Sequence, residues 1–140
     1  MSVAAILGPS IALVVLVITL LLRLAYLRVR SIRRGVVKPR DIALGQKNWT
    51  EDAIKVGNCV DNQFQLPLLF HVLTGFVLAT SKGDLLFVAL GWAFVLSRLV
   101  HAMIHITSNN VVTRFYAYAT GLLLLAVLWL LFAAKIIIGV

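Results

Sequence analysis

The sequence predicts an all-α integral membrane protein, a single domain over residues 1–140 that folds as a bundle of four transmembrane helices. Of the 140 residues, 61% are hydrophobic, and the mean hydropathy of +1.01 lies far above that of soluble domains. A helix needs about 20 apolar residues to cross a bilayer. Four runs approach or exceed that length and nearly exhaust the chain: residues 3–27, 64–80, 85–106 and 115–138.

The first run, residues 3–27, is aliphatic until its C-terminal end. It lacks the positive start and the small-residue cleavage site of a signal peptide, so we expect it to remain as an anchor. Arg23, Tyr26 and Arg30 recur at spacings of three and four and share one helical face. Arg23 and Arg30 therefore have two interpretations: they extend to lipid headgroups, or they contribute to a ligand site.

Basic residues follow the first run and are absent before it. The positive-inside rule therefore predicts that the loop at about residues 28–57 is cytoplasmic and that both termini are external. This topology accounts for much of the net charge of +8. We expect membrane lipids, and no nucleic acid, as partners, because no aromatic-rich basic fold accompanies the charge. The loop's basic residues are Arg28, Arg30, Arg33, Arg34, Lys38, Arg40, Lys47 and Lys55.

The second run, residues 64–80, has a polar entry followed by a proline. Asn58, Asn62 and Gln65 fall within about 60° of one another on a helix and form one polar face. Pro67 removes a backbone donor and can kink the helix, which membrane helices tolerate when neighbouring groups satisfy the freed carbonyl. The sequence thus predicts a polar, kinked entry to this span.

The third run, residues 85–106, contains a charge near mid-membrane. Arg98, His101 and His105 fall within about 60° on one face of this helix. Burying such a charge costs about 2.5 to 3.5 kcal/mol, and these residues generally face a bundle interior or a wet cavity. We therefore expect this face to form one wall of an intramembrane site. The roughly opposite side carries small residues suited to close packing: Ala89, Ala93 and Ser97.

The polar faces of the second and third runs are predicted to meet, because a short turn joins the two helices and makes them antiparallel. At about 1.5 Å per residue, Gln65 and Arg98 lie about 22 and 20 Å from that turn, and Asn62 and His101 about 27 and 24 Å. The stripe could be a hydrogen-bond network that only ties helices together. Surplus positive charge beside a single carboxylate, Asp61, favours a pocket for an anionic guest.

Other chemistries find little support in the sequence. It contains no Gly-rich phosphate loop, H-E-x-x-H, CxxC or G-x-S-x-G motif. The single cysteine, Cys59, excludes an internal disulfide and a multi-cysteine metal site. His101 and His105 have the spacing of metal ligands but no third ligand other than Asp61, so we expect no metal. The fourth run, residues 115–138, is predicted to face lipid or to pack.

Two strings carry a resemblance to a known family: Asn62-Gln-Phe-Gln-Leu-Pro67, and Arg98-Leu-Val-His-Ala-Met-Ile-His105 followed by Asn109 and Arg114. With four spans and a basic first loop, the chain resembles the MAPEG family, the membrane-associated proteins of eicosanoid and glutathione metabolism. The resemblance covers nearly the whole chain and is to the bacterial branch. It implies a multi-pass protein of the bacterial inner membrane.

The resemblance also implies a trimer that holds glutathione between subunits near the cytoplasmic side. Asn62 and Gln65 fall on the family's N-x-x-E motif, and Arg114 lies near the arginine that stabilises the thiolate. Departures include Gln65 in place of glutamate, and an amide is a weaker acceptor for a cation than a carboxylate is. Asn58 also departs from the pattern, standing where arginine is common, and His105 and His101 stand at positions where the family has tyrosine or another aromatic residue. The resemblance further implies that Arg23 or Arg30 contacts the tripeptide.

Two functions follow for the same residues. The first is binding of glutathione or a similar thiol and action as a transferase or peroxidase on lipophilic small molecules, with Arg98 or Arg114 as the catalytic thiolate stabiliser. Binding would involve Arg23, Arg30, Asn58, Asn62, Gln65, His101 and His105. The alternative is a non-catalytic lipid-binding or membrane-organising oligomer, in which the polar stripe only locks helices together.

Overall fold

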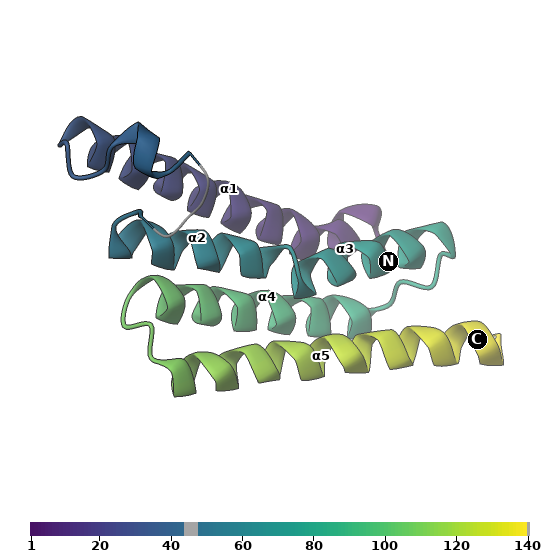
Figure 1. Cartoon of the computed structure of the whole chain (residues 1–140). Coiled ribbons are helices and arrows are strands. Elements are labelled where there is room, and N and C mark those ends of the chain that lie inside the picture. The colour runs from purple at the N-terminus through teal and green to yellow at the C-terminus, as the bar shows by residue number, and fades with distance from the viewer. Residues whose placement is uncertain (44–47, 140) are drawn as a thin grey trace.

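The computed structural model describes residues 1–43 and 48–139, and every regular element in these residues is helical. Figure 1 shows α2 and α3 following one another along nearly the same line, so the five α-helices form a bundle of four rods. This confirms the all-α bundle. The elements are α1 (Val3–Arg33), the 3₁₀-helix η1 (Pro39–Asp41), α2 (Glu51–Gln63), α3 (Leu66–Ala79), α4 (Leu85–Ile106) and α5 (Val111–Ile138).

The connection between α1 and α2 is shorter than the predicted loop of residues 28–57. α1 continues to Arg33, and α2 already begins at Glu51. Charge explains both extensions, because basic residues in the last turn of α1 and acidic residues in the first turn of α2 each complement a helix dipole. Gly35, with φ +69°, lies just beyond the end of α1. Lys47, counted in the basic loop, lies outside the described residues.

The helix breaks between α2 and α3, as the proline predicted. α2 ends at Gln63, Gln65 adopts φ −100° and ψ −96°, and Pro67 occupies the first turn of α3, where its missing N–H is not needed. With 14 residues, α3 measures only about 21 Å and cannot cross a core of about 30 Å alone. Within the described residues, three helices are individually long and apolar enough to cross a membrane, namely α1, α4 and α5.

The apolar core lies in the half of the bundle that holds both termini (Figure 1). Its centre is Phe70, a fully buried ring that stacks on Phe94 at 5.1 Å and on Phe87 at 6.1 Å between centroids. Gly91 lets the helices approach, because a Cβ there would lie 3.2 Å from both Phe70 and Pro9. A second apolar cluster joins α1, α2 and α4 towards the other end: Leu20, Leu24, Ala53, Val56, Cys59, Val60 and Ala102.

An ion pair joins the start of α4 to the end of α5. The Asp84 carboxylate accepts a hydrogen bond from the Phe87 amide at 2.8 Å and one from the Lys135 ammonium at 2.5 Å. Burial alone would raise the pKa of Asp84, but the hydrogen bonds from Lys135 and Phe87 outweigh it and hold the pKa below its usual value. Asp84 therefore acts as both the N-cap of α4 and a tie to the C-terminal helix.

We expect Asp84→Ala to destabilise the protein more than Asp84→Asn does. Both lose the ion pair, which at this exposure contributes at most about 1 kcal/mol, while alanine also loses a cap contributing about 1 kcal/mol. Because the folded pKa is lowered, the charge-dependent stability is present at neutral pH and is lost as the pH falls through that pKa. Thermal unfolding in mild detergent at pH 7 and pH 3 measures this. A gap between wild type and Asp84→Asn that persists unchanged at pH 3 would contradict it.

Candidate functional site

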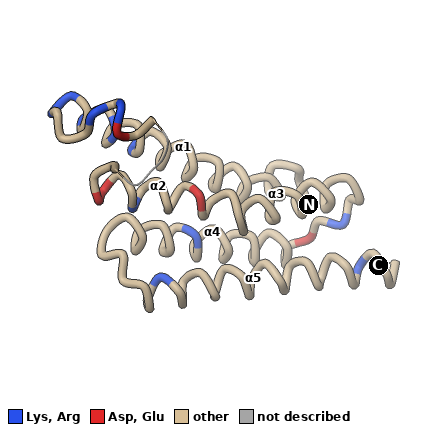
Figure 2. The backbone as a smooth tube through the Cα atoms, viewed as in Figure 1, with Lys and Arg blue, Asp and Glu red and all other residues tan. Residues whose placement is uncertain are grey.

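Arg98 lies near the middle of α4, inside the bundle and somewhat nearer the end opposite the termini (Figure 2). The side chain is completely buried, and one guanidinium nitrogen, Nη2, donates to the backbone carbonyl of Asn62 at 3.5 Å. This contact joins α4 to α2 through the Asn62 backbone alone. The predicted polar face of α2 does not meet Arg98, because Asn58 and Gln65 are exposed and the Asn62 amide donates to the Asn58 carbonyl. Phe64 and Gln65, where the helix is interrupted, follow directly after α2, so the polar end of α2 lies beside the buried cation.

Arg98 and the two histidines of α4, His101 and His105, form one buried cluster, called the Arg98 group below. Nη2 of Arg98 donates to Nδ1 of His101 at 3.3 Å, and an arginine can only donate, so this ring nitrogen carries no proton. The His101 and His105 rings meet edge to face with centroids 5.6 Å apart, and both side chains are 2% exposed. The spacing of three and four residues predicted this shared face.

Tyr118 of α5 links the buried group to the surface. Its ring lies 5.8 Å from the Arg98 guanidinium carbon and 5.9 Å from the His101 ring, while its hydroxyl donates to Oε1 of Gln65 at 3.4 Å. Gln65 is exposed, and Tyr118 is half-buried. A guest that contacted Gln65 and Tyr118 would therefore be separated from the Arg98 charge by a single aromatic ring.

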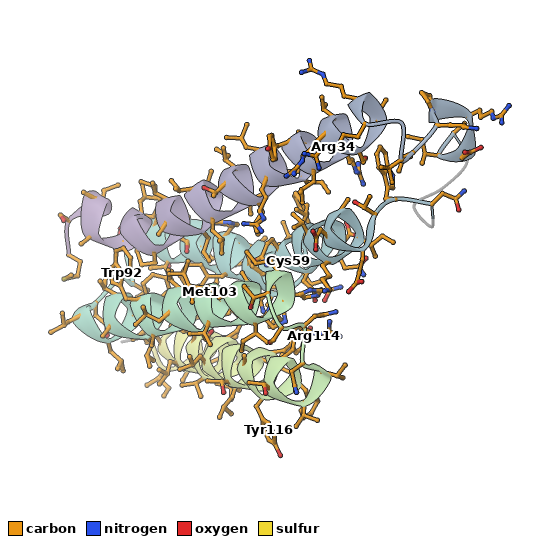
Figure 3. The ribbon with its side chains drawn as sticks, turned by 90° about the vertical axis from the view of Figure 1, so that its left-hand side faces the viewer. Arg34, Cys59, Trp92, Met103, Arg114 and Tyr116 are labelled. Atoms are coloured by element: carbon orange, nitrogen blue, oxygen red, sulfur yellow. The ribbon has the colours of Figure 1, made fainter. Side chains whose placement is uncertain are left out.

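Arg114 lies one helical turn before Tyr118, at the start of α5. It donates a hydrogen bond to the Asn109 side chain, and Asn109 adopts the left-handed conformation with φ +50° in the turn between α4 and α5. The guanidinium is half-buried rather than enclosed. Figure 3 shows Arg114 near this turn, whereas Tyr116, two residues later, points away from the bundle. Arg114 is thus the more accessible of the two candidate thiolate stabilisers.

Three of the predicted site residues do not join the Arg98 group within one chain. Arg23 and Arg30 are exposed on α1, and Asn58 is exposed beside a hollow between α1 and α2 that Asp61 also lines. Asp61 forms no salt bridge to Arg98 among the described residues, which contain three salt bridges, all elsewhere. The single carboxylate expected near the cation therefore leaves it uncompensated.

The buried group retains unused hydrogen-bonding capacity. Among the described residues, Arg98 Nε, Arg98 Nη1 and His105 Nδ1 are buried without a protein partner. Unsatisfied buried donors, above all charged ones, cost several kcal/mol in an apolar medium, so these atoms have hydrogen-bonding capacity that the chain itself does not use. The donor set suits a carboxylate or thiolate, while no group of three or more potential metal ligands occurs in the described part of the chain.

Comparison with known families bears directly on this arrangement. A family model, described as the MAPEG family, matches residues 6–134 and so covers most of the chain. The chain belongs to the MAPEG family. No curated protein and no solved structure matched it. Membership in the MAPEG family, together with three helices long and apolar enough to cross a bilayer, makes this a multi-pass membrane protein.

Tyr118 is the residue of this MAPEG protein that sequence reasoning missed. The fourth run reads as a packing helix because its aliphatic segment dominates the pattern. The sequence did contain a signal, because the inner face of α5 shows a helical spacing of four, three and four residues: Arg114, Tyr118, Gly121 and Leu125. Gly121 brings α5 close to α4, because a Cβ there would lie 3.0 Å from the Ser97 hydroxyl.

Replacing Tyr118 separates its two contacts. Tyr118→Phe removes a long hydrogen bond and is expected to cost less than about 1 kcal/mol in stability. Tyr118→Leu also removes the ring beside Arg98, a contact of about 1 to 2 kcal/mol when desolvated, and should cost more. Thermal unfolding of both variants in the same detergent measures the difference. Equal losses would show that the ring contributes nothing to holding Arg98.

Proposed function

We propose that this MAPEG protein binds glutathione or a related thiol and acts as a transferase or peroxidase on lipophilic small molecules drawn from the bilayer. The observation that carries the proposal is Arg98, a completely buried cation with two guanidinium nitrogens unpaired within the chain. A fixed positive charge in a medium of low dielectric constant favours a nearby thiolate over a thiol. Family membership supplies the class of guest.

In this proposal some residues touch the guest directly, and Arg98 acts on it through its charge. Gln65 and the Asn62 side chain, on the outer side of α2, supply amides for the peptide, and Tyr118 covers the route to Arg98. Arg114 is accessible enough to touch the sulfur, so Arg98 acts on the thiol through its charge and Arg114 acts by contact. The histidines His101 and His105 fix the position of Arg98 and offer a further donor or acceptor.

A homotrimer would complete the site. Arg23, Arg30 and Asn58 are exposed and separate from the Arg98 group, so they reach a guest there only from a neighbouring subunit. The proposed topology has both termini external and the first loop cytoplasmic in a bacterial inner membrane. Its support is that both termini lie at one end of the bundle and most basic residues lie towards the other (Figures 1 and 2).

One observation favours a second candidate, a non-catalytic lipid-binding or membrane-organising oligomer. Arg98 is enclosed, and its hydrogen bonds to Asn62 and His101 already tie α4 to α2. Such contacts stabilise membrane bundles without serving any ligand, each by about 0.6 to 2 kcal/mol. In this case the polar stripe would be structural, and no thiol would bind.

Added glutathione distinguishes the two functions. A ligand that binds only the folded state stabilises it by RT ln(1 + [L]/Kd), about 2.7 kcal/mol at 100 times the dissociation constant. We expect the melting temperature of the detergent-solubilised protein to rise with glutathione concentration. Oxidised glutathione, which lacks a free thiol, is the control for nonspecific anion effects. No rise at millimolar glutathione would favour the structural role.

A further inference from the structure

An arginine cluster at the C-terminal end of α1 lies apart from the Arg98 group. Arg30 and Arg33 belong to the last turn of α1, Arg34 caps it, and all three are exposed. Figure 2 shows basic residues gathered at this end of α1 and in η1, which project beyond the rest of the bundle. Figure 3 places Arg34 on α1, far from Arg114 on α5. This cluster is a second cationic surface.

The cluster surrounds a surface hollow with a volume of ≈ 280 Å³. Its described lining contains three guanidinium groups, a phenol and one apolar side chain, with no acidic residue: Tyr26, Val29, Arg30, Arg33 and Arg34. Guanidinium groups bind phosphate and carboxylate oxygens through paired N–H donors. The lining therefore has the chemistry of an anion site, with three guanidinium donors beside a phenol and one apolar side chain.

A lipid-facing apolar stripe leads directly to this hollow. Ile18, Leu22 and Tyr26 follow one another at spacings of four residues along α1, and they are 51%, 68% and 62% exposed. Large aliphatic side chains so exposed on a membrane helix are available to contact hydrocarbon. Tyrosine is enriched where hydrocarbon meets headgroups. The surface thus changes from aliphatic to phenolic to cationic along one line, as a phospholipid changes from chain to glycerol to phosphate.

The length of α1 places Tyr26 and the arginines at the depth of the boundary between hydrocarbon and headgroups. Its 31 residues measure about 46 Å, close to the 40 to 45 Å of a bilayer with its headgroups. From the N-terminal end of the helix, Tyr26 lies at about 35 Å and Arg33 at about 45 Å. When the aliphatic part occupies the hydrocarbon, Tyr26 lies at its boundary and the arginines lie among the phosphates.

Charge selects the outer side of the cluster. A second hollow, with a volume of ≈ 200 Å³, lies against Arg30 and Arg34 on the side facing α2, and its lining includes Asp52. A carboxylate there repels an anion, whereas the outer hollow has none. The C-terminal partial charge of α1 also opposes an anion, but it amounts to about half an elementary charge against three guanidinium groups.

We propose that the outer hollow of α1 binds the phosphate group of an anionic phospholipid, whose acyl chain lies along Ile18 and Leu22. This site shares Arg30 with the proposed thiol site but is otherwise separate from it: Arg33 and Arg34 hold the phosphate, Tyr26 contacts the glycerol region, and Arg30 borders both surfaces. Binding a lipid there would anchor the end of α1 and the connection to α2 at the membrane surface.

Native mass spectrometry of the full-length protein titrated with phosphatidylglycerol tests the proposal. We expect phosphatidylglycerol to bind more tightly than phosphatidylcholine. The double variant Arg33→Gln/Arg34→Gln should lose on the order of tenfold or more in phosphatidylglycerol affinity, since each basic group near an anionic membrane contributes substantially. Arg30 stays in place, so a glutathione titration of the same variant should match wild type.

The matched control is Lys38→Gln/Arg40→Gln, which removes the same charge from the same connection but lies outside the hollow. It should keep phosphatidylglycerol affinity within about threefold of wild type. Equal losses in both double variants would indicate diffuse attraction and overturn the site. Equal binding of the two lipids would also overturn it. Glycerol 3-phosphate binding as tightly as the lipid would instead identify a site for a soluble anion and remove the role of the acyl stripe.

Discussion

Arg98→Met should abolish about half or more of the stabilisation that glutathione gives the protein, while the ligand-free variant keeps or gains stability. Removing a desolvated, uncompensated charge relieves a cost to folding, and methionine fills much of the same volume. Loss of the charge should weaken thiol binding at least tenfold, or about 1.4 kcal/mol. At a glutathione concentration of 100 times the wild-type Kd, the stabilisation would fall from about 2.7 to about 1.4 kcal/mol.

The measurement is a set of thermal unfolding curves across a glutathione titration. Asn62→Ala and Gln65→Ala should give weaker versions of the same loss, because each removes one amide and leaves the charge. Arg40→Met, which removes an exposed arginine paired with Asp41 far from the site, is the control and should titrate as wild type does. If Arg98→Met lowers ligand-free stability and leaves glutathione stabilisation intact, Arg98 only joins helices.

Phe70→Ala should cause the largest loss of stability of any single change considered. Phe70 is completely buried, stacks on Phe87 and Phe94, and packs against Gly91, where a Cβ would lie 3.2 Å from its ring. Truncating a buried phenylalanine costs about 3 to 5 kcal/mol. Thermal or denaturant unfolding in mild detergent measures the change.

Phe115→Ala is the matched control for this cavity. It makes the same chemical change on a ring that is 63% exposed near the start of α5, and its effect should stay within about 0.5 kcal/mol. Similar losses in the two variants would mean that the aromatic cluster does not form the core.

Periodicity in the sequence was sufficient to predict much of this arrangement. The shared buried face of Arg98, His101 and His105 follows from residue spacing. The antiparallel turn places α4 beside α2, but Arg98 contacts the Asn62 backbone and not the predicted side-chain face. The helix break followed from Pro67. Such features depend on local geometry, which one chain specifies by itself.

Features that depend on charges at helix ends, on a single aromatic residue in an aliphatic helix, or on neighbouring subunits were harder to predict. The ends of α1 and α2 extend into the supposed loop because charges at their termini complement the helix dipoles, and a hydropathy window does not register this. Tyr118 was missed because one aromatic residue in an aliphatic helix stands out only when the inner face is traced from Arg114. The positions of Arg23, Arg30 and Asn58 relative to a guest depend on other subunits and remain a prediction.

The most direct test of thiolate stabilisation is a pH titration of the glutathione thiolate absorbance in the presence of the protein. An uncompensated buried cation at Arg98 and an accessible one at Arg114 predict that bound glutathione ionises at a lower pH than free glutathione does. Arg114→Met should move the transition back towards that of free glutathione. Identical titrations of glutathione with and without saturating wild-type protein would contradict the proposed thiol site.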